Sequence, residues 1–479
     1  MTTAIIWFRR DLRLSDNPAL LAAVERADFV IPLYIHQSRL DQPWSIGSAS
    51  RWWLHQSLRA LDSSIRSVGS GLVIRQGEPL EILREIAATH GVQSVYWNRL
   101  YDPDEVARDT HIKKAFKDGG LAVETFNSAL LYEPWEISRS GGEPYRVFTP
   151  FWKAMQALGL KRAPEPAPAT MSPLPDGVRS DSIDSLELLP RIPWDQGFYE
   201  SWSVGEAAAY ARLSEFRNTA LAHYKTGRDF PGHVGTSRLS PHLHFGEISP
   251  RQVVNLLLHD LDFGCGTDCL SYLREIAWRE FAVHLLFHFP HTIDSPMDAR
   301  FKGLPWRKDY ENDLKQWQRG LTGFPIIDAG MRELWHTGWM HNRVRMIAAS
   351  LLTKNLLIPW HEGARWFWDT LVDADLASNT MGWQWTAGCG ADAAPYFRIF
   401  NPILQGERFD PQGEYIRRWV PELSALSSRF IHKPWEASES LLADSDVKLE
   451  KDYPRPMIDL KESRERALTA FGVIKSSAL

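Results

Sequence analysis

Near its start the chain reads Ala4-Ile-Ile-Trp-Phe8-Arg-Arg-Asp-Leu-Arg-Leu-Ser-Asp-Asn-Pro18-Ala-Leu-Leu-Ala-Ala-Val-Glu-Arg26. A short, apolar, β-rich run is followed there by an amphipathic stretch, and this pair of patterns recurs along the first 130 residues. Strands and helices that alternate in this way predict a parallel sheet covered by helices. We expect strands over residues 4–8, 30–35, 71–75, 94–98 and 121–126, and helices over residues 18–26, 50–68, 79–90 and 104–117.

The pattern changes twice along the rest of the chain. Seven prolines between residues 161 and 195 disfavour regular helix and predict an extended linker on the surface. From about residue 205 the runs are helical, with a helix start at Ser249-Pro250. Other expected helices cover residues 205–224, 267–289 and 338–357. The predicted fold class is therefore α/β followed by all-α, with boundaries at 1–132, 133–204 (linker) and 205–479.

Composition limits the functional class. The formal net charge of −5 creates no overall attraction to nucleic acid, so DNA binding would need a local basic patch. Cys265, Cys269 and Cys389 are too few for a disulfide framework or a usual iron–sulfur cluster, and we expect small buried residues and no metal site. No membrane span and no signal peptide is apparent. We therefore expect a cytoplasmic protein.

Two classes of cofactor site find little support in the first domain. Ligands of parallel sheets usually bind beyond the carboxyl ends of the strands. However, neither G-x-G-x-x-G nor G-x-x-x-x-G-K-[ST] follows the first strand. A nicotinamide or ATP site is therefore not expected there.

Two helical segments place useful side chains on one face. Glu275, Trp278 and Arg279 lie at i, i+3 and i+4, which indicates either a Glu275–Arg279 surface pair beside an indole or part of a binding site. Asn342 and Met346 also share a helix face. They form either a solvent-facing amide above a core methionine, or an edge that hydrogen-bonds a ligand and packs on its plane.

Two further stretches are candidates for ligand contacts. Thr236-Ser-Arg-Leu-Ser240 offers hydroxyls at an expected helix start, which is a weak sign of a phosphate site. Asp373-Ala-Asp-Leu-Ala-Ser-Asn379-Thr-Met-Gly-Trp383-Gln-Trp385 combines carboxylates, a carboxamide and two indoles. It is not a calcium loop, because Ser378 replaces the required glycine and no bidentate glutamate follows. Its acidic residues can also be simple helix caps.

Several motifs follow one another in a fixed order: Trp7-Phe-Arg-Arg-Asp-Leu-Arg-Leu14, Phe148-Thr-Pro-Phe151, Thr236-Ser-Arg-Leu-Ser240, Trp278-Arg-Glu280, Thr322-Gly-Phe-Pro325, Trp339-Met-His-Asn-Arg-Val-Arg-Met346 and Gly382-Trp-Gln-Trp385. Together they resemble the photolyase/cryptochrome family, and the resemblance covers nearly the whole chain. It implies an N-terminal five-stranded, Rossmann-like antenna domain and a C-terminal helical domain that binds FAD.

The resemblance also implies which residues hold the flavin. The phosphate and ribose side would be lined by Tyr224, Thr236, Ser237, Arg238, Leu239 and Ser240, with Tyr272 also among the cofactor-binding residues. The isoalloxazine ring would be surrounded by Arg345, Asp373, Asp375 and Asn379, with the Asn379 carboxamide at the N5 edge. A chain of Trp383, Trp360 and Trp306 would pass electrons to photoexcited oxidised flavin.

By the same resemblance, the expected activity is light-driven repair of cyclobutane pyrimidine dimers in DNA. The dimer is flipped out of the duplex, which costs less at a damaged site. Trp278 and Trp385 would pack against it, Glu275 and Asn342 would bind its base edges, and Met346 would fill the space beside it. The expected phosphate contacts are Arg228, Arg343 and Arg398.

The resemblance leaves one main alternative, a cryptochrome-like photoreceptor. Relatives acting on (6-4) photoproducts carry two histidines where Asn342 and Met346 stand, and plant-type cryptochromes usually have Asp at the Asn342 position and lack Trp278. The stretch that begins Arg51-Trp52-Trp53 resembles bacterial class III photolyases. An antenna pigment is expected, most commonly methenyltetrahydrofolate; Trp52 and Trp53 either line its pocket or pack in the core. We expect a monomer without an obligate protein partner.

Overall fold

Five parallel strands form one sheet in the N-terminal part of the chain. The computed structural model describes residues 1–38, 43–159, 162–259 and 266–476. The sheet order is β3-β2-β1-β4-β5, so the prediction of a parallel sheet is confirmed. Its strands are β1 (Thr3–Phe8), β2 (Phe29–His36), β3 (Val73–Gln76), β4 (Val92–Asn98) and β5 (Ala122–Phe126).

Both faces of the sheet are covered, because β1 sends alternate side chains into two different cores. Ala4, Ile6 and Phe8 pack in the core that includes helices α1 and α2. Ile5 and Trp7 pack on the other face, in the core that includes α3 and α4. The four helices are α1 (Pro18–Arg26), α2 (Ser48–Ser67), α3 (Pro79–Thr89) and α4 (Pro103–Asp118).

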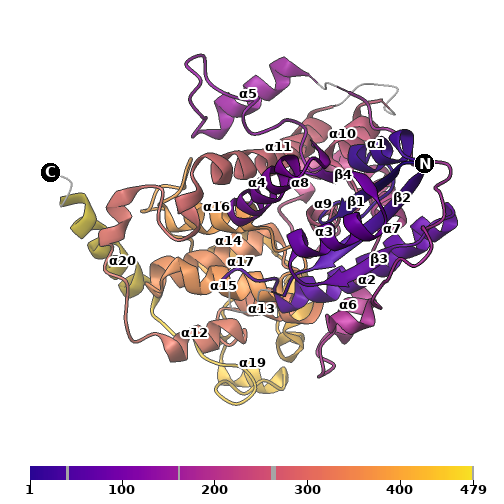
Figure 1. The fold of residues 1–479 in the computed structure, drawn as a ribbon. Coiled ribbons are helices and arrows are strands. Elements are labelled where there is room, and N and C mark those ends of the chain that lie inside the picture. Colours follow the sequence, from indigo (N-terminus) through magenta and orange to yellow (C-terminus); the bar gives the residue numbers. More distant parts are fainter. Residues whose placement is uncertain (39–42, 160–161, 260–265, 477–479) are drawn as a thin grey trace.

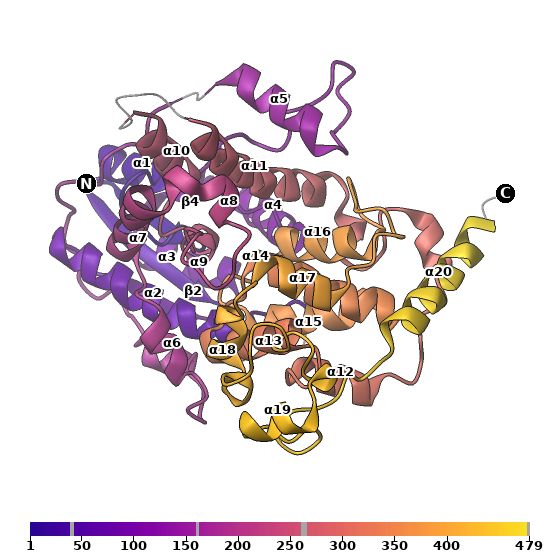
Figure 2. The same cartoon turned by 180° about the vertical axis from the view of Figure 1, so that it is seen from behind.

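The proline-rich segment runs along the sheet domain in extended form. Its backbone bonds the end of α2 through Met171 N to Val68 O (2.7 Å), and β3 through Asp181 N to Ile74 O (2.8 Å). The segment between the two domains is not without structure, since it contains α5 (Phe148–Leu158), η1 (Asp184–Leu186) and α6 (Gln196–Ser201). Helix α5 lies over α11 (Thr267–His288) in both side views (Figures 1 and 2).

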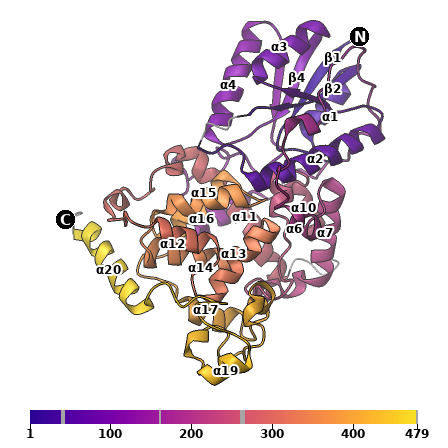
Figure 3. The same cartoon turned by 90° about the horizontal axis from the view of Figure 1, so that it is seen from below.

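The second part of the molecule is helical and lies against one side of the sheet domain (Figure 3). Among the described residues after 205 no strand forms, and there is only an isolated bridge between Leu449 and Tyr453. None of the helices in the described ranges is long and apolar enough to cross a membrane. The remaining helices are α7 (Glu206–Thr219), α8 (Tyr224–Gly227), α9 (Ser240–His244), α10 (Pro250–His259), α12 (Glu311–Gln318), α13 (Pro325–Thr337), α14 (Asn342–Ser350), α15 (Trp360–Thr370), α16 (Leu376–Ala387), α17 (Pro402–Phe409), α18 (Glu414–Trp419), α19 (Glu439–Asp444) and α20 (Leu460–Ser476).

Two expected helices have different bounds. The helix expected over residues 205–224 is interrupted, because α7 ends at Thr219 and a short turn precedes α8. The helix expected over residues 338–357 begins only at Asn342. Gly338 adopts the left-handed conformation (φ +68°) that ends α13, and His341 caps the start of α14.

Buried polar contacts join the sheet domain to the helical part. Asp16, which is fully buried, accepts hydrogen bonds from Ser249 and from Arg251 (3.1 Å) at the start of α10. Arg13 donates to the carbonyl O of Gly246 (2.8 Å). Of the cysteines, Cys269 and Cys389 are buried as expected, and Cys265 lies outside the described residues.

Glu280 on α11 links this helix to the backbone of residues 131 and 132, just before the segment between the domains. One carboxylate oxygen accepts hydrogen bonds from the backbone N–H groups of Leu131 (3.0 Å) and Tyr132 (3.4 Å). Burial raises the pKa of Glu280 to about 7, although Arg279 and the two N–H groups oppose the shift. The folded state therefore holds a proton here in a range where the unfolded chain does not.

We predict that Glu280→Gln removes a pH dependence of stability. Between about pH 4.5 and pH 7 the folded protein binds more protons at Glu280 than the unfolded chain, so the unfolding free energy falls as pH rises. The variant cannot ionise there, and its stability relative to the parent should rise by up to about 3 kcal/mol across this window. Urea unfolding across the window measures this. Glu439→Gln, an exposed control on α19, should keep the pH slope of the parent, and equal slopes in Glu280→Gln and the parent would contradict the prediction.

Candidate functional site

The partner of Glu275 on α11 is a residue far away in sequence. Its carboxylate accepts a hydrogen bond from the guanidinium of Arg228, just after α8, and both side chains are about one quarter to one third exposed. The alternative Glu275–Arg279 surface pair is wrong, because Arg279 turns its guanidinium to the carbonyl groups of Ala129 (2.7 Å) and Leu243 (3.4 Å). Arg228 and Glu275 thus sit together at the junction of α8 and α11.

Trp278, one turn further along α11, is stacked on Phe148 of α5. The ring centroids are 3.7 Å apart and the planes differ by 7°. Trp278 is only half-buried, so Phe148 covers one face of the indole and fixes its plane. Phe148 is held in turn by its backbone N–H, which donates to Asp392 (3.2 Å). The FTPF motif pointed to this segment, but nothing in the sequence showed the stack.

The start of α14 carries the exposed amide of Asn342, whose Nδ2 lies 4.0 Å from the sulfur of Met346. The two residues share one face of the helix, as the spacing predicted. Arg343 points elsewhere, forms an ion pair with Asp229 (2.5 Å) and lies over the ring of Phe409. Its guanidinium is therefore already occupied by a carboxylate in this structure.

Tyr224, Tyr272 and Ser237 come together between α8, α11 and the loop before α9. The two phenol rings make an edge contact, with centroids 5.1 Å apart, and the Tyr272 hydroxyl donates to Ser237 Oγ (3.0 Å). Thr236 and Leu239 belong to the same loop, with Leu239 buried and Thr236 half-buried. Three of the predicted cofactor-binding residues, Tyr224, Tyr272 and Ser237, are thus connected by direct contacts at this loop.

Arg238, in the middle of that loop, has an unusual conformation for a non-glycine residue, with φ at +52°. Its guanidinium lies over the rings of Trp202 (4.8 Å) and Trp339 (4.5 Å), and its buried Nε has no hydrogen-bond partner among the described residues. Burial lowers the pKa of Arg238, although the Glu333 carboxylate acts in the opposite direction. A half-buried cation with a strained backbone and an unpaired, buried donor atom is well suited to an anionic ligand.

Asp373 connects three separate helices. Its carboxylate accepts hydrogen bonds from Ser240 Oγ (2.6 Å) at the start of α9 and from Arg345 Nη2 (2.9 Å) on α14, and it stands three residues before α16. Arg345 also donates Nε to the carbonyl O of Met340 (2.7 Å). Of the residues predicted around the ring of a flavin, Arg345 and Asp373 are therefore joined by a direct bond.

Asp375 and Asn379 lie at the start of α16. Asp375 caps the helix by accepting the N–H of Ser378 (2.8 Å) and lies 3.5 Å from His244. Burial opposes ionisation, yet the His244 contact and the Ser378 bond hold the pKa of Asp375 below its ordinary value. Asn379 donates Nδ2 to the carbonyl O of Ala364 (3.0 Å), which fixes the amide plane. The capping role left open by the sequence is correct for Asp375.

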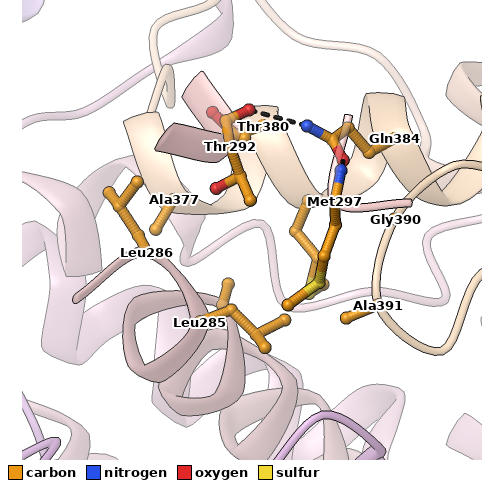
Figure 4. A pocket seen from close by; sticks show the side chains of 11 residues that line it. Leu285, Leu286, Thr292, Met297, Ala377, Thr380, Gln384, Gly390 and Ala391 are labelled. Carbon is orange, nitrogen blue, oxygen red and sulfur yellow. Dashed lines mark hydrogen bonds between the residues drawn. The ribbon is translucent and has the colours of Figure 1, made fainter. Parts of the chain in front are cut away.

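The opposite face of α16 is packed rather than open. Gln384 donates to the carbonyl O of Thr292 (2.6 Å) and accepts the N–H of Met297 (2.9 Å), as Figure 4 shows. These bonds border a cavity of about 20 Å³ lined mainly by apolar side chains such as Leu285 and Ala377. Such a space holds about one water molecule. This face therefore positions the helix and leaves its other faces to carry the predicted site.

Three tryptophans of the predicted electron path belong to one hydrophobic cluster. Trp383 and Trp360 are almost fully buried in it, and the half-buried Trp306 packs against it. The rings nearest to Trp383 include those of Phe367 (5.0 Å) and Trp317 (6.2 Å). Trp317 was not predicted as part of the path, and a buried indole in a core gives no sequence signal for such a role.

Trp385 and Arg398 lie at the other end of α16 and in the segment after it. Trp385 is half-buried, and its carbonyl O accepts the N–H of Ala394 (3.3 Å). Arg398 is exposed and follows Phe397, which is 63% exposed. The exposed guanidinium can meet a solvent-borne anion, whereas those of Arg228 and Arg343 are paired with carboxylates.

Comparison with known proteins identifies the family. A family model described as DNA photolyase matches residues 4–170, and one described as the FAD binding domain of DNA photolyase matches residues 272–473. The deoxyribodipyrimidine photo-lyase of Agrobacterium fabrum is 48% identical over 99% of this chain and 98% of its own length. The chain belongs to the photolyase/cryptochrome family. Cryptochrome-1 of Arabidopsis thaliana is 39% identical over 97% of this chain and 69% of that protein.

The fold agrees with this membership of the photolyase/cryptochrome family. The crystal structure of a bacterial class III photolyase from Agrobacterium tumefaciens matches with a TM-score of 0.96 and 47% identity, over 99% of this chain and 98% of that chain. The expected order of an N-terminal α/β domain and a C-terminal helical FAD domain is confirmed.

The residues present fit the FAD that this family's domain binds. The unpaired Nε of Arg238, with Ser237 and Ser240 on either side, suits a diphosphate. Arg345 offers a cation, and Asn379 offers a fixed carboxamide that can serve as donor or acceptor. These residues would hold the cofactor, while Glu275 and Trp278 lie on the exposed side of α11.

We predict that Gly363→Ala displaces Trp383. A Cβ at position 363 on α15 would lie 2.0 Å from the Trp383 ring, which is far closer than van der Waals contact. Overpacking of this kind should cost about 1–3 kcal/mol of stability, measured by urea unfolding, and should change the near-ultraviolet circular dichroism of the indoles. Gly382→Ala on α16 is the matched control, because its Cβ meets no atom within 4 Å. A similar loss of stability in both variants would refute the proposed clash.

Proposed function

We propose that this protein repairs cyclobutane pyrimidine dimers in DNA in a light-driven reaction with FAD as cofactor. The observation that carries the proposal is the fixed, partly exposed indole of Trp278. Phe148 stacks on one face of this indole, with ring centroids 3.7 Å apart, and Trp278 stays half-buried. Glu275 lies beside it on the preceding turn of α11. A flat, fixed, apolar wall next to a carboxylate suits two splayed bases with polar edges.

When bound, FAD would supply the photochemistry, a light-driven transfer of an electron to the dimer and back that breaks its two inter-base bonds. The protein's part is to bind and orient the substrate. Asn379, held by its bond to the carbonyl O of Ala364, would present its carboxamide to the edge of the flavin ring. Asp373 fixes the position of the Arg345 guanidinium through a hydrogen bond of 2.9 Å.

The residues proposed to contact the substrate come from three helices, α11, α14 and α16. Trp278 and Trp385 pack against the dimer, Glu275 and Asn342 bind the base edges, and Met346 fills the space beside them. A dimer stacks poorly within the duplex before it is flipped out, so its extrusion costs less free energy than that of an intact base.

Three arginines position the DNA strand. Arg398 is exposed and free to meet a phosphate, while Arg228 and Arg343 are paired with Glu275 and Asp229. Binding at these two positions would require exchange of a carboxylate for a phosphate. Local contacts of this kind work despite the net charge of −5.

A cryptochrome-like photoreceptor is the second candidate. The 39% identity to Arabidopsis Cryptochrome-1 favours it. A (6-4) photolyase fits less well, because Asn342 and Met346 stand where those enzymes carry two histidines.

The deciding experiment uses purified, reduced protein and an oligonucleotide that contains one thymine cyclobutane dimer, in blue light and in darkness. Light-dependent restoration of the thymines establishes repair. An absence of repair by a protein with normal flavin content and photoreduction would favour the photoreceptor. Light scattering of the same sample tests our further expectation of a monomer without an obligate protein partner.

We predict that Glu275→Ala keeps FAD but repairs the dimer less well. Loss of one hydrogen bond to the substrate should weaken dimer affinity about tenfold, measured by titration of the dimer oligonucleotide. Glu462→Ala removes the same charge as Glu275→Ala, but on α20, away from the site. This control should leave the dimer affinity unchanged. Loss of flavin from the purified Glu275→Ala protein would show that Glu275 holds the cofactor instead.

We predict that Trp383→Phe slows the photoreduction of oxidised flavin and leaves repair by pre-reduced enzyme nearly intact. The indole is the electron donor in the first process and takes no part in the second. Flash photolysis compares the photoreduction rates of variant and parent. Equal rates would remove Trp383 from the path, and Trp317 would become the candidate to test.

We also propose a second, antenna pigment, with methenyltetrahydrofolate as the expected compound. Trp52 and Trp53 do not face an opening, since both are fully buried and Trp53 donates Nε1 to Glu247 (3.1 Å). A cavity of about 710 Å³ beside α2 is lined by Arg51, His55 and Trp194 among others. A guanidinium suits the folate carboxylates and an indole suits its ring. Reconstitution with the folate, followed by absorbance after gel filtration, should show less pigment on Arg51→Ala.

A further inference from the structure

A buried lysine contacts the segment that carries Arg398. We call residues 388–401, between α16 and α17, the 388–401 loop. Lys354 is 1% exposed, and its Nζ donates to the carbonyl O of Arg398 (2.9 Å). The same ammonium lies 5.4 Å from the ring centroid of Tyr396. A single cation therefore reaches the loop at the backbone of the exposed arginine.

Burial of the Lys354 ammonium has a high cost in desolvation free energy. In the described part of the chain no carboxylate forms an ion pair with Lys354, and its partners there are a backbone carbonyl and a ring face. Burial lowers the pKa of Lys354 to about 8, and the nearby charge of Arg398 adds to this effect, while Cys389 opposes it. A methionine of similar length would avoid the desolvation cost. The charge-assisted bond to the loop is what the ammonium gains in return.

The local backbone directs the lysine to the loop. Residues Leu351–Asn355 form a π-turn that extends α14, with Leu356 N bonded to Leu351 O (2.9 Å). Two residues after this segment, Leu357 has φ at +52° although it is not glycine. A π-turn inserts one residue relative to an α-helix and so rotates the side chains that follow. Such irregular turns are frequent at functional sites.

The two ends of the loop are held by other means. Gly390 N bonds to Gln384 O (3.1 Å) at the end of α16, and Phe400 N bonds to Ser350 Oγ (3.2 Å) on α14. Tyr396 stacks on Phe471 of α20, with ring centroids 4.6 Å apart. Between these anchors, the Lys354 bond fixes the peptide that bears Arg398.

We propose that Lys354 is a positioning residue that holds the 388–401 loop so that Arg398 meets a phosphate of the DNA strand beside the dimer site. The proposal rests on the proposed function and adds a residue that touches neither DNA nor cofactor. Lys354 acts through the loop backbone, and the Arg398 side chain makes the contact.

The first test measures how readily the 388–401 loop is cleaved by a protease in the absence of DNA. Full-length, FAD-containing Lys354→Met is treated with trypsin, and cleavage after Arg398 is followed by mass spectrometry. Loss of the bond frees an exposed segment, so cleavage should be about three- to tenfold faster than in the parent. Lys433→Met is the matched control, because Lys433 pairs at the surface with Glu407 and Glu436. Equal cleavage rates in Lys354→Met and the parent would overturn the proposal.

The second test measures the KM for the dimer-containing oligonucleotide. Lys354→Met should raise the KM for the dimer oligonucleotide about three- to tenfold, with unchanged kcat and flavin content. In the Arg398→Ala background the same substitution should have no further effect, whereas with Arg343→Ala the effects should multiply. An unchanged KM, or full additivity with Arg398→Ala, overturns the proposal. A parent that does not repair the dimer refutes the proposed function instead, and the trypsin result still decides the role of Lys354.

Discussion

The carboxylate of Asp373 is the point on which the helical site depends. It receives hydrogen bonds from Ser240 and Arg345, and so joins the start of α9, the middle of α14 and the approach to α16. Each of these helices carries a different part of the proposed flavin site. Loss of Arg345 would leave the buried carboxylate without its countercharge, and loss of the Ser240 hydroxyl would leave it one hydrogen bond short. The three helices are therefore coupled through one side chain.

The sequence predicted the sheet well because its signal is local. Residues 4–8 are buried without a gap, which is typical of a central parallel strand, and the prolines at positions 18, 79 and 103 mark helix starts. The helix bounds near residue 340 could not be predicted in the same way. A left-handed Gly338 and a π-turn at residues 351–355 interrupt a continuous amphipathic pattern, and both depend on tertiary contacts.

The residues of the candidate site also fall into two groups, those that a local pattern predicts and those that depend on contacts across the fold. Residues that share a helix face, such as Asn342 and Met346, follow from a period of 3.6 residues. Contacts across the fold do not: the Arg228 partner of Glu275 is 47 residues away, and the Phe148 face on Trp278 comes from another helix. The local rule even favoured the wrong partner for Glu275, because a single helix displays only pairs of residues three or four positions apart.

The stack of Phe148 on Trp278 has a consequence for the modularity of the enzyme. Phe148 belongs to the connection between the two domains, whereas Trp278 belongs to the helical domain. The proposed substrate wall is thus assembled from two separate portions of the polypeptide. A helical unit excised at residue 205 would keep the residues proposed to line the flavin and lose Phe148, which supports the proposed wall. The connecting segment is therefore part of the proposed site, and exchange of N-terminal domains between relatives must carry it along with the helices.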